Sequence, residues 1–195
     1  SVAQLGAHLQ RLLSQMADGG ERTLSELNLI EHRPLVSTDF STDLCIHQAI
    51  ARQVVATPDA LAVTFAHTQL TYAELDAQAN RLAHKLLELG VGPEVRVGVA
   101  MPRSEQLLIA LLAVLKSGGA YVPLDPDYPA DRVAYMLEDS RARVLLTEQA
   151  VAATLSVPGD TQVLLLDQLS LSDYSAVAPK TTVQPDNLAY VIYTS

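Results

Sequence analysis

Apolar residues recur along most of the chain at helix or strand spacing, and short polar or glycine-containing stretches separate these segments. From Val2 to Met16 they recur every three or four positions, which predicts an amphipathic helix ending at Asp18-Gly19-Gly20. Residues 21–43 contain a short leucine cluster followed by Pro, Ser and Thr, a composition typical of a connector. We therefore expect a helical linker arm over residues 1–37 and a folded domain over residues 38–195.

The folded domain is predicted to alternate helices and strands. Helices are expected at about residues 42–56, 71–90, 104–117 and 129–138, with one more short helix before residue 163. Strands are expected at residues 61–66, 95–100, 120–124, 144–147, 163–166 and 188–193. Apolar strands that alternate with helices indicate a mainly parallel sheet with helices on both faces. The predicted fold class is α/β, with a doubly wound, mainly parallel sheet covered by helices.

Several polar residues are explained by helix ends. Thr71 and Glu74 have the spacing of a capping box, and Ser104 can cap the helix that follows it. Gly118-Gly119 is interpreted as a helix C-cap and tight turn rather than as a close approach to a ligand. Lys116, in the last turn of the same helix, is explained by the favourable helix dipole. None of these residues is assigned a chemical role.

Composition excludes several classes of function. A hydrophobic content of 49% over 195 residues indicates a packed core. The net charge is −9 with no basic stripe, so nucleic acid is not an expected partner. The longest apolar run without charge, Leu107 to Leu115, is far shorter than the roughly 20 residues of a membrane span, so no membrane association is expected. The single cysteine, Cys45, fits a reducing compartment and predicts a cytoplasmic protein, and it is interpreted as a small buried hydrophobe rather than a nucleophile.

The acidic residues and histidines do not predict a metal site. Asp125, Asp127 and Asp131 lie close together, but prolines interrupt them and their spacing is not that of a calcium loop, so they are assigned to turns and a helix start. The histidines have no zinc-ligand spacing, and they are His8, His32, His47, His67 and His84. His47 is interpreted as structural because its neighbour Ile46 is expected to face the core. We therefore predict no catalytic residue and no metal ligand within this chain.

The last predicted strand runs directly into Thr194 and Ser195. Ligands of open α/β sheets bind beyond the carboxyl ends of strands. Hydroxyl and backbone N–H groups at such a turn can hold phosphate oxygens. Taken alone, the pair is equally explained by local hydrogen bonding at a strand end.

Three segments of the chain are distinctive, and they are LTYAEL at residues 70–75, LKSGGAYVPLDPDYPADR at 115–132 and LAYVIYTS at 188–195. Their order and approximate spacing resemble those of the adenylation domains of nonribosomal peptide synthetases. Residues 44–195 thus resemble the N-terminal part of an amino-acid adenylation domain, an incomplete adenylate-forming subdomain that stops within the phosphate-binding loop. Residues 1–43 resemble the end of a condensation domain and its linker.

The resemblance implies a function. Members of the family use ATP with Mg²⁺ to convert an amino acid to aminoacyl-AMP, which then loads the phosphopantetheine of a downstream carrier domain. By that match, Thr194 and Ser195 are cofactor-binding residues that would contact the β- and γ-phosphates. The family's amino-acid pocket, nucleoside contacts and catalytic lysine lie further along, so the 195-residue chain alone is expected to be inactive. Its expected partners are the amino-acid substrate and the upstream condensation and downstream carrier domains of the same synthetase.

Two alternatives remain open. An acyl- or aryl-CoA ligase shares the fold and the phosphate loop, although the segment at 115–132 favours the synthetase. A non-catalytic inter-domain scaffold would use the N-terminal helix to dock a neighbour. A sheet that lacks later strands has an open edge and uncovered apolar surface, so the isolated chain is expected to be marginally stable or to self-associate.

Overall fold

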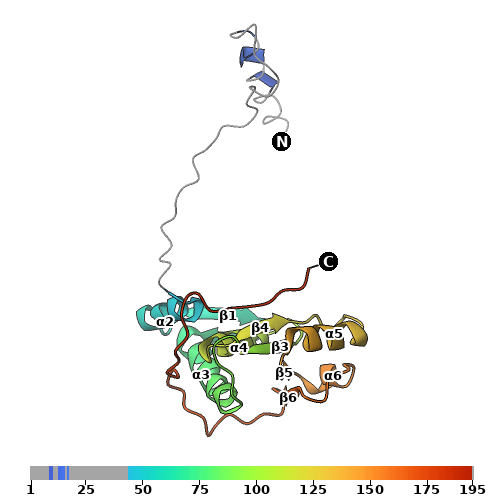
Figure 1. Ribbon diagram of the computed structural model, residues 1–195. Helices are drawn as coiled ribbons and strands as arrows, with labels where there is room; N and C mark the ends of the chain where they lie inside the picture. The colour runs from blue at the N-terminus through green and yellow to red at the C-terminus, as the bar shows by residue number, and fades with distance from the viewer. Residues whose placement is uncertain (1–8, 11–12, 16, 18–43, 195) are drawn as a thin grey trace. The chain divides into compact units, whose positions relative to one another are not determined.

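The computed structural model describes residues 9–10, 13–15, 17 and 44–194 (Figure 1). The chain divides into two units, residues 1–41 and 42–195. The described residues of the first unit are helical. The predicted boundary near residue 37 and the connector before residue 44 lie outside the described residues, and that boundary remains a prediction.

A four-stranded sheet forms the centre of the second unit. Its strands, in spatial order, are β4 (Ala120–Pro123), β3 (Arg96–Ala100), β5 (Val144–Thr147) and β6 (Gln162–Leu165). Every neighbouring pair is parallel. The chain passes from β3 to β4 on one side and then returns to form β5 on the other side of β3. This order confirms the predicted doubly wound α/β class.

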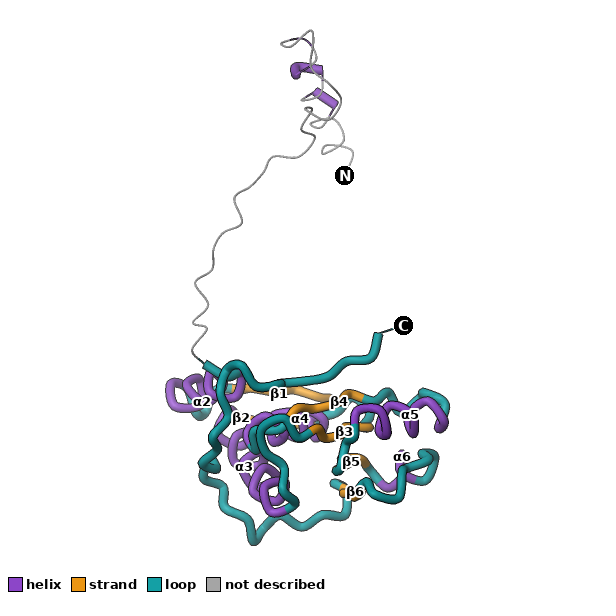
Figure 2. Tube along the Cα trace, viewed as in Figure 1, coloured by secondary structure: helices purple, strands orange, loops and turns teal. Residues whose placement is uncertain are grey.

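Helices cover both faces of the sheet. On one face α3 (Tyr72–Glu88) and α4 (Glu105–Lys116) pack together, and on the other lies α5 (Ala130–Ser140) (Figures 1 and 2). In β5 the side chains alternate between the two cores, with Leu146 facing α3 and α4 and Leu145 facing α5. Burying each such leucine contributes about 2 kcal/mol. The remaining helices are α2 (Ile46–Ala56) and α6 (Gln149–Ala152).

A small antiparallel hairpin stands apart from this sheet. It pairs β1 (Leu61–Phe65), which the apolar pattern predicted, with β2 (Thr68–Thr71), which it did not. Phe65 pairs with Thr68 across a two-residue turn in which Ala66 has φ of 51°. Turns of this kind are usually marked by Asn-Gly or Asp-Gly. Ala66-His67 carries no such mark, which explains why the second strand was missed.

The predicted N-caps are confirmed. Glu74 N donates to Thr71 Oγ1 at 3.2 Å, and Thr71 N donates to Glu74 Oε2 at 2.8 Å. The hydrogen bonds that the Thr71 N–H and hydroxyl donate to the Glu74 carboxylate lower the pKa of Glu74. At the start of α4, Leu107 N donates to Ser104 Oγ at 3.2 Å. Both helices therefore begin where the local sequence predicts.

The two glycines after α4 have different reasons to be glycine. Gly118 has φ of +86°, a conformation that favours glycine, and this confirms the predicted helix end. A Cβ on Gly119 would lie 2.7 Å from Val91 Cγ1 and 3.1 Å from Val95 O. Gly119 is thus required by close packing against the segment before β3, rather than by the cap.

No helix in the described part of the chain is long and apolar enough to cross a membrane.

Candidate functional site

The segment that leads to Thr194 lies beside β4. Tyr121 N donates to Ala189 O at 3.1 Å, and Val191 N donates to Tyr121 O at 3.0 Å. These bonds form a single parallel bridge, between Tyr121 and Tyr190. The predicted strand over residues 188–193 is therefore wrong as a regular strand, because only one bridge of the ladder is made. Pro123 explains where pairing stops, since the next donor toward the segment would be an N–H that proline lacks.

Tyr193 anchors the end of this segment to the face of the sheet that α5 covers. Its hydroxyl donates to Asp139 Oδ2 at 2.5 Å and lies 3.4 Å from Met136 O. Burial, followed by the hydrogen bond to Asp139, raises the pKa of Tyr193 to about 12. The phenol therefore stays protonated and donates at neutral pH. Because Tyr193 directly precedes Thr194, this contact restricts where Thr194 can lie.

Thr194 is exposed and makes no hydrogen bond with the described part of the chain. Its hydroxyl is thus available to a ligand. Ser195, the second residue predicted to bind phosphate, lies outside the described residues. The structure consequently positions one of the two predicted residues.

A hollow of about 630 Å³ lies next to Tyr193 and Ile192. Its other walls come from the ends of β3 and β4 and the turns after them, including Arg103, Asp125 and Tyr128. This is the carboxyl edge of the sheet, where ligands of open α/β folds bind. The sequence interpretation did not single out Arg103. Arg103 lies three residues after the end of β3. The rule that ligands bind beyond the carboxyl ends of strands, which indicated Thr194, could therefore have indicated Arg103 as well.

The aspartates near this hollow have the predicted turn and helix-start roles. Asp127 N donates to Asp125 Oδ1 at 3.0 Å, which closes a tight turn. Asp131 lies in the first turn of α5. Among the described residues, no three His, Cys, Asp or Glu side chains are grouped so that they could hold a metal ion.

Lys116 has a different role from the predicted one. Its ammonium is buried and lies 2.7 Å from both Asp76 Oδ1 and Asn80 Oδ1 on α3. Asn80 Nδ2 in turn donates to Asp76 Oδ2 at 2.8 Å and to Ala176 O at 2.7 Å. The helix dipole alone is therefore an insufficient explanation for Lys116. It joins α4 to α3 through a buried ion pair.

Cys45, Ile46 and His47 lie at the start of α2. Ile46 is 50% exposed, so the expectation that it faces the core is wrong. His47 is half-buried, and burial together with the nearby Lys116 charge lowers its pKa. Cys45 is a free cysteine at the N-cap, where its N–H donates to Gln48 Oε1 at 3.0 Å, and it is half-buried rather than buried as predicted. These contacts fit structural roles for both residues.

Residues 50–195 match the family described as AMP-binding enzyme. Tyrocidine synthase 3 of Brevibacillus parabrevis is 40% identical over 100% of this chain and 3% of its own length. The dimodular nonribosomal peptide synthase of Bacillus subtilis is 38% identical over 98% of this chain and 9% of its own length. The chain thus spans only a small fraction of these relatives.

Solved structures show the same similarity. The nonribosomal peptide synthetase FmoA3 (S1046A) aligns with a TM-score of 0.74 and 37% identity, covering 78% of this chain and 16% of that one. Its AMPPNP-bound form aligns with a TM-score of 0.77 and 31% identity, covering 100% of this chain and 22% of that one. The fold described above is therefore similar to part of a nucleotide-binding synthetase.

Proposed function

The chain belongs to the AMP-binding enzyme family, and we propose that it is part of a nonribosomal peptide synthetase module that activates an amino acid with ATP as aminoacyl-AMP. One observation carries the proposal. Residues 50–195 match the family. Within them, the segment that bridges to β4 at Tyr190 leads to the exposed Thr194, directly after Tyr193, which lines a hollow at the carboxyl edge of the sheet. The name of one relative, a nonribosomal peptide synthase, supports the amino acid as substrate.

The residues present could contact the phosphates of a nucleoside triphosphate. The hydroxyl of Thr194, which follows the anchored Tyr193 in the chain, would donate to phosphate oxygens, and Ser195 would add a second hydroxyl. Arg103 brings a positive charge to the same edge and could pair with a phosphate, whereas Asp125 and Asp127 in the same lining oppose an anion. When bound, ATP would supply the α-phosphate that the substrate carboxylate attacks and the pyrophosphate that leaves. Mg²⁺ would accompany the nucleotide, and we assign no ligand for it in this chain.

The wider module is also proposed. An upstream condensation domain would precede this chain, and a downstream carrier domain with phosphopantetheine would accept the aminoacyl group. The dimodular synthase among the relatives supports such neighbours. The single cysteine supports a cytoplasmic protein.

Amino-acid-dependent ATP–pyrophosphate exchange tests the activity. It should be measured on the 195-residue chain and on a chain extended through the rest of the adenylation domain, across a panel of amino acids. We expect exchange with one or a few amino acids in the extended chain, and none in the shorter one. Formation of an acyl-CoA without amino-acid-dependent exchange would replace the proposal with a CoA ligase, and silence in both assays would favour a non-catalytic scaffold.

Thr194→Ala tests the phosphate contact in the extended chain. Loss of one hydrogen bond to a charged phosphate should lower kcat/KM for ATP by about tenfold or more. Thr194→Ser, which keeps the hydroxyl, should retain most of the activity. Thr182→Ala provides a matched control, because Thr182 is exposed in the preceding loop. Equal kcat/KM for Thr194→Ala and the control would contradict a role for Thr194 in ATP binding.

A further inference from the structure

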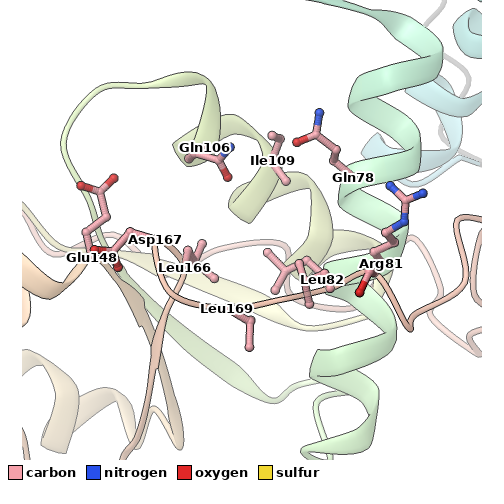
Figure 3. A pocket seen from close by; sticks show the side chains of 11 residues that line it. Gln78, Arg81, Leu82, Gln106, Ile109, Glu148, Leu166, Asp167 and Leu169 are labelled. Carbon is pink, nitrogen blue, oxygen red and sulfur yellow. The ribbon is translucent and has the colours of Figure 1, made fainter.

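A second hollow, of about 720 Å³, lies between α3, α4 and the loops that follow β5 and β6 (Figure 3). Its size is within the range of small-molecule sites. It shares no lining residue with the hollow beside Tyr193. The proposed nucleotide contact of Thr194 therefore does not account for it.

Its position is one where α/β folds bind ligands. Glu148 directly follows β5, and Asp167 lies two residues beyond the end of β6. Both carboxylates thus stand at the carboxyl edge of the parallel sheet. The opposite wall is formed by residues of α3 and by the first turns of α4.

Several polar side chains of this hollow lack protein partners among the described residues, although Asp167 and Ser172 have them. Arg81 Nε is buried, and within the described residues it has no hydrogen-bond partner. The side chains of Gln78, Gln106 and Glu148 also make no hydrogen bond with the part of the chain that the structure describes. Buried polar groups are rarely left unpaired, so an uncommitted donor inside a cavity suggests that a ligand acceptor completes it.

The two ends of the hollow differ in charge. Figure 3 shows the carboxylates of Glu148 and Asp167 at one end and Arg81 at the other, with apolar side chains such as Leu166 and Leu82 between them. The acidic end is preformed, because Gln149 N donates to Asp167 Oδ1 at 3.0 Å. That bond ties the loop after β6 to the start of α6.

We propose that this hollow binds a short zwitterion whose carboxylate and ammonium groups are separated by an apolar body, such as a short apolar peptide with free ends. The carboxylate pairs with Arg81 and satisfies its Nε. The ammonium lies at Glu148 and Asp167, and the apolar body covers the leucines of the floor. None of these residues belongs to the proposed adenylation site, so a result that contradicts one proposal leaves the other unaffected.

Binding of trileucine to the full 195-residue chain tests the proposal, by a ligand-observed NMR titration. Trileucine amide lacks the carboxylate and N-acetyl-trileucine lacks the ammonium, so each should bind about tenfold more weakly. Arg81→Gln should lower the affinity for trileucine by about tenfold, and trileucine and its amide should then bind equally well. Glu148→Gln should reduce the difference in affinity between trileucine and N-acetyl-trileucine.

Arg52→Gln and Glu138→Gln are matched controls, because both residues are exposed, on α2 and α5. They should leave all three affinities unchanged. Thermal melts check that each variant folds, and if Arg81→Gln does not fold, Glu148→Gln decides alone. Absence of saturable binding at millimolar trileucine would overturn the proposal. Equal affinities for the three peptides would do the same, because they would show apolar adhesion without recognition of the charges.

Discussion

At the scale of single residues, Lys116 shows how a tertiary contact can be hidden behind a plausible local explanation. Its side chain is only 3% exposed, and its charge is balanced by Asp76, which is 18% exposed. An ammonium left in such a place without its counter-charge loses solvation that nothing replaces. The pair is therefore far more important to the fold than an ion pair at the surface.

Asp76→Asn should destabilise the chain by about 3 kcal/mol, because the Lys116 ammonium stays buried with neutral partners only. Urea unfolding followed by circular dichroism measures the change. The matched control is Glu88→Gln, which removes the charge of a pair with Lys85 that is 59% exposed on the Glu88 side. The amide oxygen of the glutamine can still accept the hydrogen bond that the Tyr174 hydroxyl donates to Glu88. That control should change stability by about 0.5 kcal/mol or less. Similar losses in the two variants would show that the buried pair carries no special weight.

Comparing Lys116 with the N-caps shows which side-chain contacts can be predicted from the sequence and which cannot. Thr71 and Glu74 are three positions apart, so their reciprocal hydrogen bonds follow from helix geometry alone. Lys116 and Asp76 are 40 positions apart, and nothing in the neighbourhood of either residue indicates the other. Arg103 lies between these cases, since its position after a strand was visible but its approach to the hollow depends on how the turn folds.

At the scale of elements, the segment before Thr194 is the clearest departure from the apolar pattern. Its alternating residues suit a strand, and two hydrogen bonds to Tyr121 hold it in parallel register. Pairing needs a donor and an acceptor on both partners, however, and β4 ends in Pro123. Hydrophobic pattern predicts which segments can be strands, whereas the partner's backbone decides how far the ladder extends.

Pro123→Val should extend the ladder, because the new N–H can donate to Val191 O. Stability should change little, since a hydrogen bond worth about 1 kcal/mol is offset by about 0.4–1 kcal/mol of chain entropy that proline removes from the unfolded state. Hydrogen exchange is the sensitive measurement, and the amides of residue 123 and Tyr193 should become protected. Pro185→Val, in the preceding loop, should protect neither. Fast exchange at both amides in Pro123→Val would show that something other than the missing donor ends the pairing.

At the scale of the whole molecule, the alternation of strands and helices predicted the α/β class because that class follows from local pattern alone. Which strands become neighbours was not predicted, since the order β4-β3-β5-β6 depends on packing against α3, α4 and α5. The hollow of Figure 3 could not be predicted from the sequence either, because Arg81 and Glu148 come to line the same hollow only when the sheet has formed.

The segment before Thr194 also leaves apolar surface at the sheet edge. Leu188, Tyr190 and Ile192 alternate along it and are 37%, 50% and 56% exposed. Adjacent exposed apolar groups beside an incompletely paired backbone favour association between copies. We therefore expect the 195-residue chain to show a mass that rises with concentration in light scattering.

Ile192→Lys should shift that equilibrium toward the monomer, because a charge on the most exposed of these three residues opposes both apolar contact and edge pairing. Val177→Lys is the matched control, since Val177 is 74% exposed but lies in the loop after β6. If the control dissociates the chain as well as Ile192→Lys does, added charge rather than this edge governs association. If wild type is monomeric throughout and melts in one sharp transition, the edge is already protected by its single bridge to Tyr121, and the short pairing of β4 is sufficient for a stable unit.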